Sequence, residues 1–138
     1  MDAKRLEKIP LFAELPRRDR ERVARWADEI DVPAGHHLLD EGRFPHEFFV
    51  IEEGTVEVIK GGQHLADLGP GDFFGEIAIV EHERRTASVV STTPLRAIVM
   101  SPREFDLMQN EMPSVAEKVH QAIRERLGHD SDSDAQLD

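Results

Sequence analysis

Glycine is concentrated in the middle of this chain, and that concentration limits the folds open to it. Eight of the nine glycines lie between Gly35 and Gly75, separated by short runs rich in apolar and β-branched residues. Turn residues at such short intervals are typical of antiparallel sandwiches and barrels. We expect strands over residues 48–51, 55–60, 64–67, 86–91 and 95–100. The centre is therefore predicted to be an antiparallel double-stranded β-helix, a jelly-roll-like β-roll.

Both ends of the chain carry helical patterns. Val23, Trp26, Ala27 and Ile30 repeat at helical spacing opposite a charged face. After the strands, Ser101-Pro102-Arg103-Glu104 has the pattern of a capping box and opens a helix. Pro113 opens another, in which Arg124 and Arg126 suit the C-terminal end of the helix dipole. Its apolar stripe is Val115, Val119, Ala122, Ile123 and Leu127. The predicted fold is mainly β, with one N-terminal and two C-terminal helices.

Charge and length limit the domains and the ligands that this chain can have. The 138 residues allow one domain, and a net charge of −11 argues against binding a polyanion such as DNA, though not against one small anionic ligand. Residues 128–138 hold four aspartates and no Lys or Arg. We therefore predict a folded domain over 1–127 and a disordered acidic tail over 128–138.

Several classes of protein are excluded or disfavoured. Without cysteine, disulfide scaffolds, thiol nucleophiles and cysteine-ligated zinc are excluded. No apolar run reaches the roughly 20 residues of a membrane span, and the N-terminus lacks the apolar segment of a signal peptide. We expect a cytoplasmic protein that does not bind membranes by itself.

The segment from Gly69 to Val90 contains the candidate ligand-binding residues. Gly75 precedes a predicted short helix, and a glycine there lets a ligand approach the free N–H groups of the helix start. Arg85 can add a bidentate contact to a phosphate. Glu76 would repel a phosphate, so it must face a neutral donor such as a sugar hydroxyl. Each residue alone has an ordinary structural explanation, but their order and spacing predict a pocket for a phosphorylated sugar.

The same segment, FGEIAIVEHERRTASV, resembles the phosphate-binding cassette of cyclic nucleotide-binding domains, and the resemblance extends over roughly residues 5–127. It implies that Arg85 pairs with the cyclic phosphate and that Glu76 binds the ribose 2′-hydroxyl. It further implies backbone contacts near Gly75, Ile77 and Ala78, with Thr86 and Ala87 lining the pocket. Many cAMP binders carry alanine at the position of Thr86, and some cGMP-selective relatives carry threonine there. We expect cAMP in preference to cGMP, with both open.

The resemblance also implies a mechanism. Ligand binding would move the helices after Ser101, because a lid helix can touch the base only when it is closed. In a ligand-free form, exposed Val115, Val119 or Ile123 would offer a surface to a protein partner, or to a second copy through the C-terminal helix. The expected function is a sensor or regulatory module that needs no cofactor.

Three alternative functions differ in how well the sequence fits them. A metal-dependent cupin-like enzyme is disfavoured, because adjacent His36 and His37 on a strand would point to opposite faces and could not share one metal. DNA binding is disfavoured because only eleven residues follow Leu127, four of them aspartates, which are too few for a helix-turn-helix. A ligand-free interaction module on the same fold stays open. No catalytic constellation is present in the sequence, so we expect no enzyme activity and no metal site.

Overall fold

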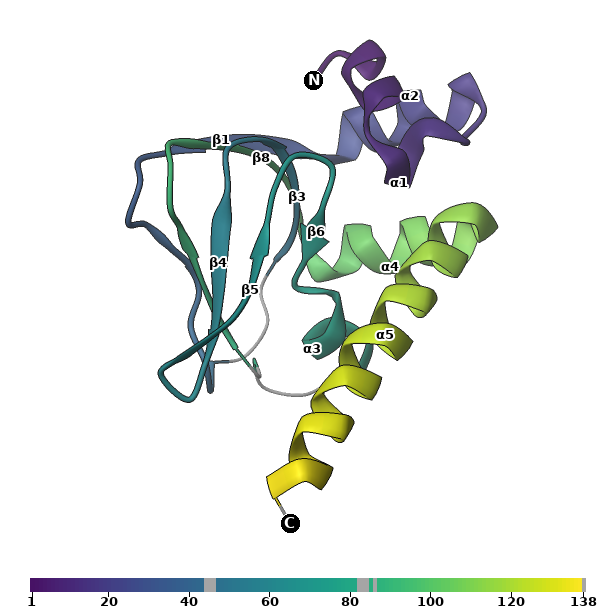
Figure 1. Ribbon diagram of the computed structural model, residues 1–138. Helices are drawn as coiled ribbons and strands as arrows, with labels where there is room; N and C mark the ends of the chain where they lie inside the picture. Colours follow the sequence, from purple (N-terminus) through teal and green to yellow (C-terminus); the bar gives the residue numbers. More distant parts are fainter. Residues whose placement is uncertain (44–46, 82–84, 86, 138) are drawn as a thin grey trace.

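The computed structural model describes the chain except residues 44–46, 82–84, 86 and 138 (Figure 1). The chain begins with η1 (Ala3–Lys8), α1 (Pro10–Ala13) and α2 (Arg17–Trp26), and α4 (Pro102–Glu111) and α5 (Pro113–Leu137) follow the strands. A short helix, α3 (Glu76–Glu81), interrupts the β-region. The strands are β1 (Asp28–Val32), β2 (His37–Leu39), β3 (Phe48–Glu53), β4 (Val56–Lys60), β5 (Gln63–Leu68), β6 (Phe73–Phe74), β7 (Ser88–Ser91) and β8 (Leu95–Met100).

The described strands form two four-stranded antiparallel sheets. One has the order β1-β8-β3-β6 and the other β2-β7-β4-β5. Apolar residues of both sheets meet in a core inside the roll: Phe49, Ile51, Val56, Phe74, Val89, Leu95, Ala97 and Val99. A second core lies between the roll and the helices, and it includes Phe12, Phe48, Phe105, Met108 and Val119. The predicted fold class, a β-roll with flanking helices, is confirmed.

Local sequence signals explain several elements. The Gly61-Gly62 turn has positive φ angles of 59° and 78°, as a tight hairpin between β4 and β5 requires. At the start of α4, the Glu104 N–H donates to Ser101 Oγ (3.2 Å), and the Ser101 N–H donates to a Glu104 carboxylate oxygen (2.9 Å). The predicted capping box is confirmed.

The N-terminal helix differs from its prediction. The helical stripe was expected to run to Ile30, but α2 ends at Trp26 and Ile30 lies in β1, paired with Ala97 of β8. In β1 the partly buried Ile30 and Val32 alternate with exposed residues, which is the two-residue period of a strand. Ile30 suited either period, and pairing with β8 decides between them.

The end of the last helix also differs. The folded domain was expected to end before Gly128, whereas α5 continues through that glycine to Leu137. A glycine inside a helix costs about 1 kcal/mol relative to alanine and does not by itself end the helix. Side chains from residue 127 onward lie outside the described part, so the division into 1–127 and 128–138 stays a prediction. Among the helices that the structure describes, none combines the length and the apolar character needed to cross a bilayer.

Candidate functional site

Gly75 joins β6 to α3 in a conformation and a space that only glycine fits. Its φ is +96°, a region that residues with a side chain rarely adopt. A Cβ atom at this position would lie 2.9 Å from the Glu47 carbonyl oxygen and 3.2 Å from Arg85 Nη1. The backbone of β6 can therefore turn into α3 directly beside the Arg85 guanidinium.

Arg85 is buried, with 6% of its surface exposed, and its orientation is fixed by the backbone. Its Nη1 donates to the Gly75 carbonyl (2.7 Å), and its Nη2 donates to the Glu47 carbonyl (2.6 Å). Burial lowers the pKa of Arg85, while the Glu76 and Glu47 carboxylates raise it. A guanidinium held out of water in this way favours an anionic partner.

Glu76, the first residue of α3, is completely buried. One carboxylate oxygen, Oε1, accepts a hydrogen bond from Arg126 Nη1, and the other, Oε2, has no hydrogen-bond partner among the described residues. Burial raises the pKa of Glu76, and the charges of Arg126 and Arg85 oppose that rise. An unpartnered buried acceptor costs about 1–3 kcal/mol, so Oε2 is suited to a donor supplied by a ligand.

Arg126 brings α5 to this site. Its Nη2 donates to the Phe73 carbonyl (2.7 Å), and its guanidinium carbon lies 5.3 Å from the centre of the Phe73 ring. The sequence predicted Arg126 only as a partner of the helix dipole and did not place it in the site. A signal was present in the sequence, because Arg126 follows Ala122 by four residues and Ile123 by three and so lies on the buried face of α5.

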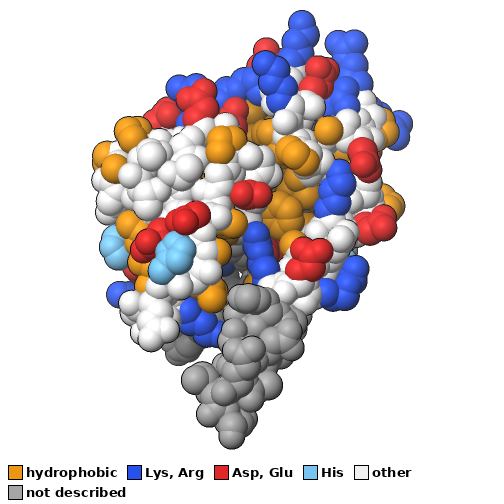
Figure 2. Space-filling view, in the orientation of Figure 1, with side chains coloured by type: hydrophobic (Ala, Val, Ile, Leu, Met, Phe, Trp, Pro, Cys, Tyr) orange, Lys and Arg blue, Asp and Glu red, His pale blue; other side chains and the backbone are white. Residues whose placement is uncertain are grey.

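The inward face of α5 is otherwise apolar, as predicted. Val115 and Val119 are fully buried and Ile123 is 5% exposed. In a ligand-free form these residues were predicted to be exposed. The structure shows the arrangement in which they are buried against the rest of the domain. The outward face is polar, as the charged side chains along α5 in Figure 2 show, and its exposed residues are Glu117, His120, Gln121, Arg124 and Glu125.

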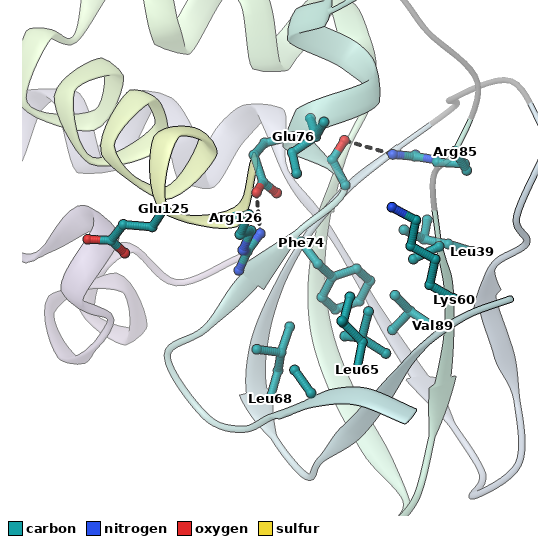
Figure 3. A pocket seen from close by; sticks show the side chains of 15 residues that line it. Leu39, Lys60, Leu65, Leu68, Phe74, Glu76, Arg85, Val89, Glu125 and Arg126 are labelled. Carbon is teal, nitrogen blue, oxygen red and sulfur yellow. Dashed lines mark hydrogen bonds and ion pairs between the residues drawn. The ribbon is translucent and has the colours of Figure 1, made fainter. Parts of the chain in front are cut away.

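A cavity of about 270 Å³ opens beside these groups, and we refer to it as the Arg85 cavity (Figure 3). Its polar lining includes Gly75, Glu76, Arg85 and Arg126, together with Lys60 and Glu125. The remainder is mostly apolar: Leu39, Val58, Leu65, Ala66, Leu68, Phe74, Ile77, Ala87 and Val89. The cavity therefore joins a charged region to an apolar one, as a ligand with an anionic group and an aromatic ring requires.

The structure brings together most of the residues predicted for the site. Gly75, Glu76, Ile77, Arg85 and Ala87 all line the Arg85 cavity. Ala78 lies in α3, with its side chain outside the described part, and Thr86 lies outside the described residues altogether.

The histidines lie apart from this cavity among the described residues. His37 Nδ1 is 3.1 Å from an Asp40 carboxylate oxygen. On the β4–β5 hairpin, His64 lies within 3.1 Å of Glu57 and 3.6 Å of Asp67, so each of its ring nitrogens faces a carboxylate at the surface. None of these side chains lines the Arg85 cavity.

Comparison with known proteins finds relatives of similar sequence. The chain is 28% identical over 124 residues to a cAMP-dependent protein kinase regulatory subunit of Neurospora crassa, a match covering 88% of this chain and 32% of the relative. It is 30% identical over 120 residues to a cyclic nucleotide-gated potassium channel of Rhizobium etli, covering 87% of this chain and 34% of the channel. It thus spans about a third of the length of these curated relatives.

A solved structure shows the same fold. The catabolite activator protein of Thermus thermophilus superposes with a TM-score of 0.78 at 24% identity, over 93% of this chain and 62% of that protein. The family model described as the cyclic nucleotide-binding domain matches residues 29–111, which is more than half of the chain. The chain therefore belongs to the cyclic nucleotide-binding domain family.

Proposed function

We propose that this chain binds a cyclic nucleotide in the Arg85 cavity and acts as a sensor or regulatory module, not as an enzyme. The observation that carries the proposal is the pairing, in one cavity, of a buried guanidinium with a buried carboxylate oxygen that has no partner among the described residues. The two groups match the two polar parts of a cyclic nucleotide, which are an anionic phosphate and a ribose hydroxyl donor.

Each site residue then has a role. Arg85 uses two N–H groups on carbonyls and keeps the others for the cyclic phosphate. Glu76 Oε2 accepts a hydrogen bond from the ribose 2′-hydroxyl. Backbone groups at Gly75, Ile77 and Ala78 complete the phosphate and ribose contacts. Thr86 and Ala87 line the pocket, and the apolar lining takes the base.

The proposed ligand is cAMP in preference to cGMP. Relatives in Neurospora crassa and Schizosaccharomyces pombe are cAMP-dependent protein kinase regulatory subunits, which supports cAMP. Because position 86 is threonine, as in some cGMP-selective relatives, cGMP is tested beside cAMP. The proposed partners are the nucleotide itself and a regulated protein.

Helix α5 is the proposed moving part. Its Arg126 bonds to the same carboxylate that would bind the ribose, so the position of α5 and the occupancy of Glu76 are energetically coupled. Displacing α5 would expose Val115, Val119 and Ile123 to a protein partner or to a second copy. With α5 in place its described outward face is polar, so an apolar dimer contact through residues 113–126 requires that displacement.

Titration calorimetry with cAMP and cGMP tests the binding directly. We expect heat of binding for the wild-type protein, with the higher affinity for cAMP, and loss of binding in Arg85→Ala. Arg96→Ala is the matched control, because Arg96 is half-exposed on β8 and pairs with Asp31 outside the cavity. No binding of either nucleotide by the wild-type protein would favour the interaction module, and wild-type affinity in Arg85→Ala would refute the site.

A further inference from the structure

Two cavities between the N-terminal helices, the roll and α5 join into one groove. The first, of about 600 Å³, is lined by residues of η1, β3 and β8, and the second, of about 370 Å³, is lined by residues of α1, the β5–β6 turn and α5. Pro10, Pro70 and Gly71 line both, so the two cavities meet there. We refer to them together as the Pro10 groove. It shares only Glu125 and Arg126 with the Arg85 cavity.

The floor of the Pro10 groove is apolar and partly open to solvent. Figure 2 shows apolar side chains gathered in the hollow between the roll and the helices. A Cβ atom at Gly71, where φ is +90°, would lie 3.2 Å from Pro10 Cδ, so the β5–β6 turn approaches α1 closely. The apolar lining includes Ile9, Pro10, Leu11, Pro70, Phe73 and Ala122.

Two lysines at the η1 end of the groove carry charges without a partner. Lys4 and Lys8 both line the groove and are exposed, and neither ammonium has a hydrogen-bond or ion-pair partner among the described residues. The carboxylates that line the same cavity are already paired with arginines, Glu52 with Arg5 and Glu53 with Arg96. The Pro10 groove therefore combines an apolar floor with free positive charge at one end.

An acidic segment of another protein fits these features better than a membrane or a nucleic acid. A flat bilayer cannot fill a groove, and a net charge of −11 opposes approach to anionic lipids. The same charge disfavours a polynucleotide. A peptide lying in the groove can place carboxylates on Lys4 and Lys8 and apolar side chains on Pro10 and Phe73.

Helix α5 forms one wall of the groove. Lys118, Gln121 and Ala122 line it from α5, and Lys118 Nζ donates to the Pro10 carbonyl (2.6 Å), which ties this wall to α1. Displacing α5 would break that bond and remove the wall. The groove is therefore complete only when α5 lies in the position that the structure shows.

We propose that the Pro10 groove docks an acidic, partly apolar segment of the protein that this module regulates, and that Lys4 and Lys8 bind its carboxylates. The inference rests on the proposed function, because it takes α5 as the part that the nucleotide moves. A nucleotide that holds α5 in place keeps the groove complete, so nucleotide and segment bind cooperatively.

A peptide-display selection on the wild-type protein with saturating cAMP tests this. We expect the selected peptides to combine Asp or Glu with apolar residues. The glutamine analogue of the strongest peptide should bind about tenfold more weakly, because two exposed ion pairs are lost. The double variant Lys4→Glu, Lys8→Glu should lose at least as much and keep its affinity for cAMP. Arg18→Glu with Arg25→Glu is the matched control, an equal change of charge at exposed positions of α2 outside the groove.

The selected peptide also tests the coupling to the nucleotide. We expect cAMP to tighten peptide binding in the wild-type protein and to have no effect on it in Arg85→Ala. A peptide affinity in the wild-type protein that does not respond to bound cAMP would overturn the coupling.

The outcomes separate this inference from the proposed function. Peptides without acidic residues, or equal affinity in the double lysine variant and the wild type, would overturn the inference. Binding of phosphatidylserine vesicles without selection of any peptide would overturn it too. In both cases, cAMP binding by the wild-type protein would leave the proposed function standing. Peptide binding by a protein that binds no cyclic nucleotide would overturn the proposed function and leave only the acidic docking site.

Discussion

At residue 75, backbone geometry and space both require glycine, and this gives a sharp prediction. In Gly75→Ala the new Cβ meets the Glu47 carbonyl oxygen at 2.9 Å in a backbone with φ of +96°. We expect the free energy of unfolding, measured by urea denaturation, to fall by about 1–3 kcal/mol. Gly69→Ala is the control, since a Cβ there meets only Thr55 Cγ2 at 3.9 Å. Equal stability of the two variants would contradict the description of this turn.

The buried carboxylate of Glu76 predicts a pH dependence with a definite sign. Its pKa in the folded protein lies above the ordinary 4.5, because burial disfavours the charged form. The folded state therefore keeps this proton at pH values where the unfolded chain has released it. The stability that Glu76 contributes is present in full below about pH 4.5 and is lost as the pH rises through the folded pKa.

Glu76→Gln checks that sign, because the amide does not titrate. Urea denaturation across a pH series should show the variant gaining stability relative to the wild-type protein as the pH rises above 4.5. A stability difference between Glu76→Gln and the wild type that is constant with pH would mean that the pKa is not raised.

Among the elements, α5 depends on a single polar anchor at the site. Arg126→Met removes the donors to Glu76 and to the Phe73 carbonyl and leaves a buried carboxylate without its cation. We expect a loss of about 1–3 kcal/mol in the free energy of unfolding, and faster hydrogen exchange in α5. Arg124→Met on the exposed face of α5 should change neither. Unchanged exchange in Arg126→Met would show that the apolar stripe alone holds the helix.

The elements that could be predicted from the sequence are those with a local signal. The neighbouring strands at 55–60 and 64–67, the capping box at Ser101 and the apolar stripe of α5 were all predicted, because each depends on neighbouring residues. The short strands β2 and β6 were not predicted as strands, since each forms only by pairing with a strand distant in the sequence. The prediction that Ile30 belongs to the N-terminal helix was wrong for the same reason.

The residues of the candidate site also divide into those that a local sequence pattern reveals and those that only the fold reveals. Glu76 and Arg85 lie in one recognisable segment, so the sequence pointed to them together. The bond between Arg126 and Glu76 joins residues 50 positions apart, and no local pattern reports such a contact. Lys60, the last residue of β4, lines the cavity together with residues of other strands, and that proximity becomes visible only when the strands are paired.

For the molecule as a whole, a net charge of −11 coexists with a cavity whose lining includes three cationic side chains. Eight of the 17 Lys and Arg residues lie in the first 26 positions, so the rest of the chain is more acidic than the total suggests. Lys60, Arg85 and Arg126 come from separate parts of that acidic remainder and meet at one cavity. This arrangement disfavours a long polyanion and suits one small anion.

Hydrogen exchange of α5 with and without saturating cAMP tests the central claim most directly, because it requires both that the nucleotide binds and that binding reaches the helix. We predict that cAMP changes exchange in α5 and around Gly75 in the wild-type protein, and leaves both unchanged in Arg85→Ala. Strand β1, none of whose residues lines the cavity, should keep its exchange rate in either protein. Exchange in α5 that stays the same at saturating cAMP would contradict the account.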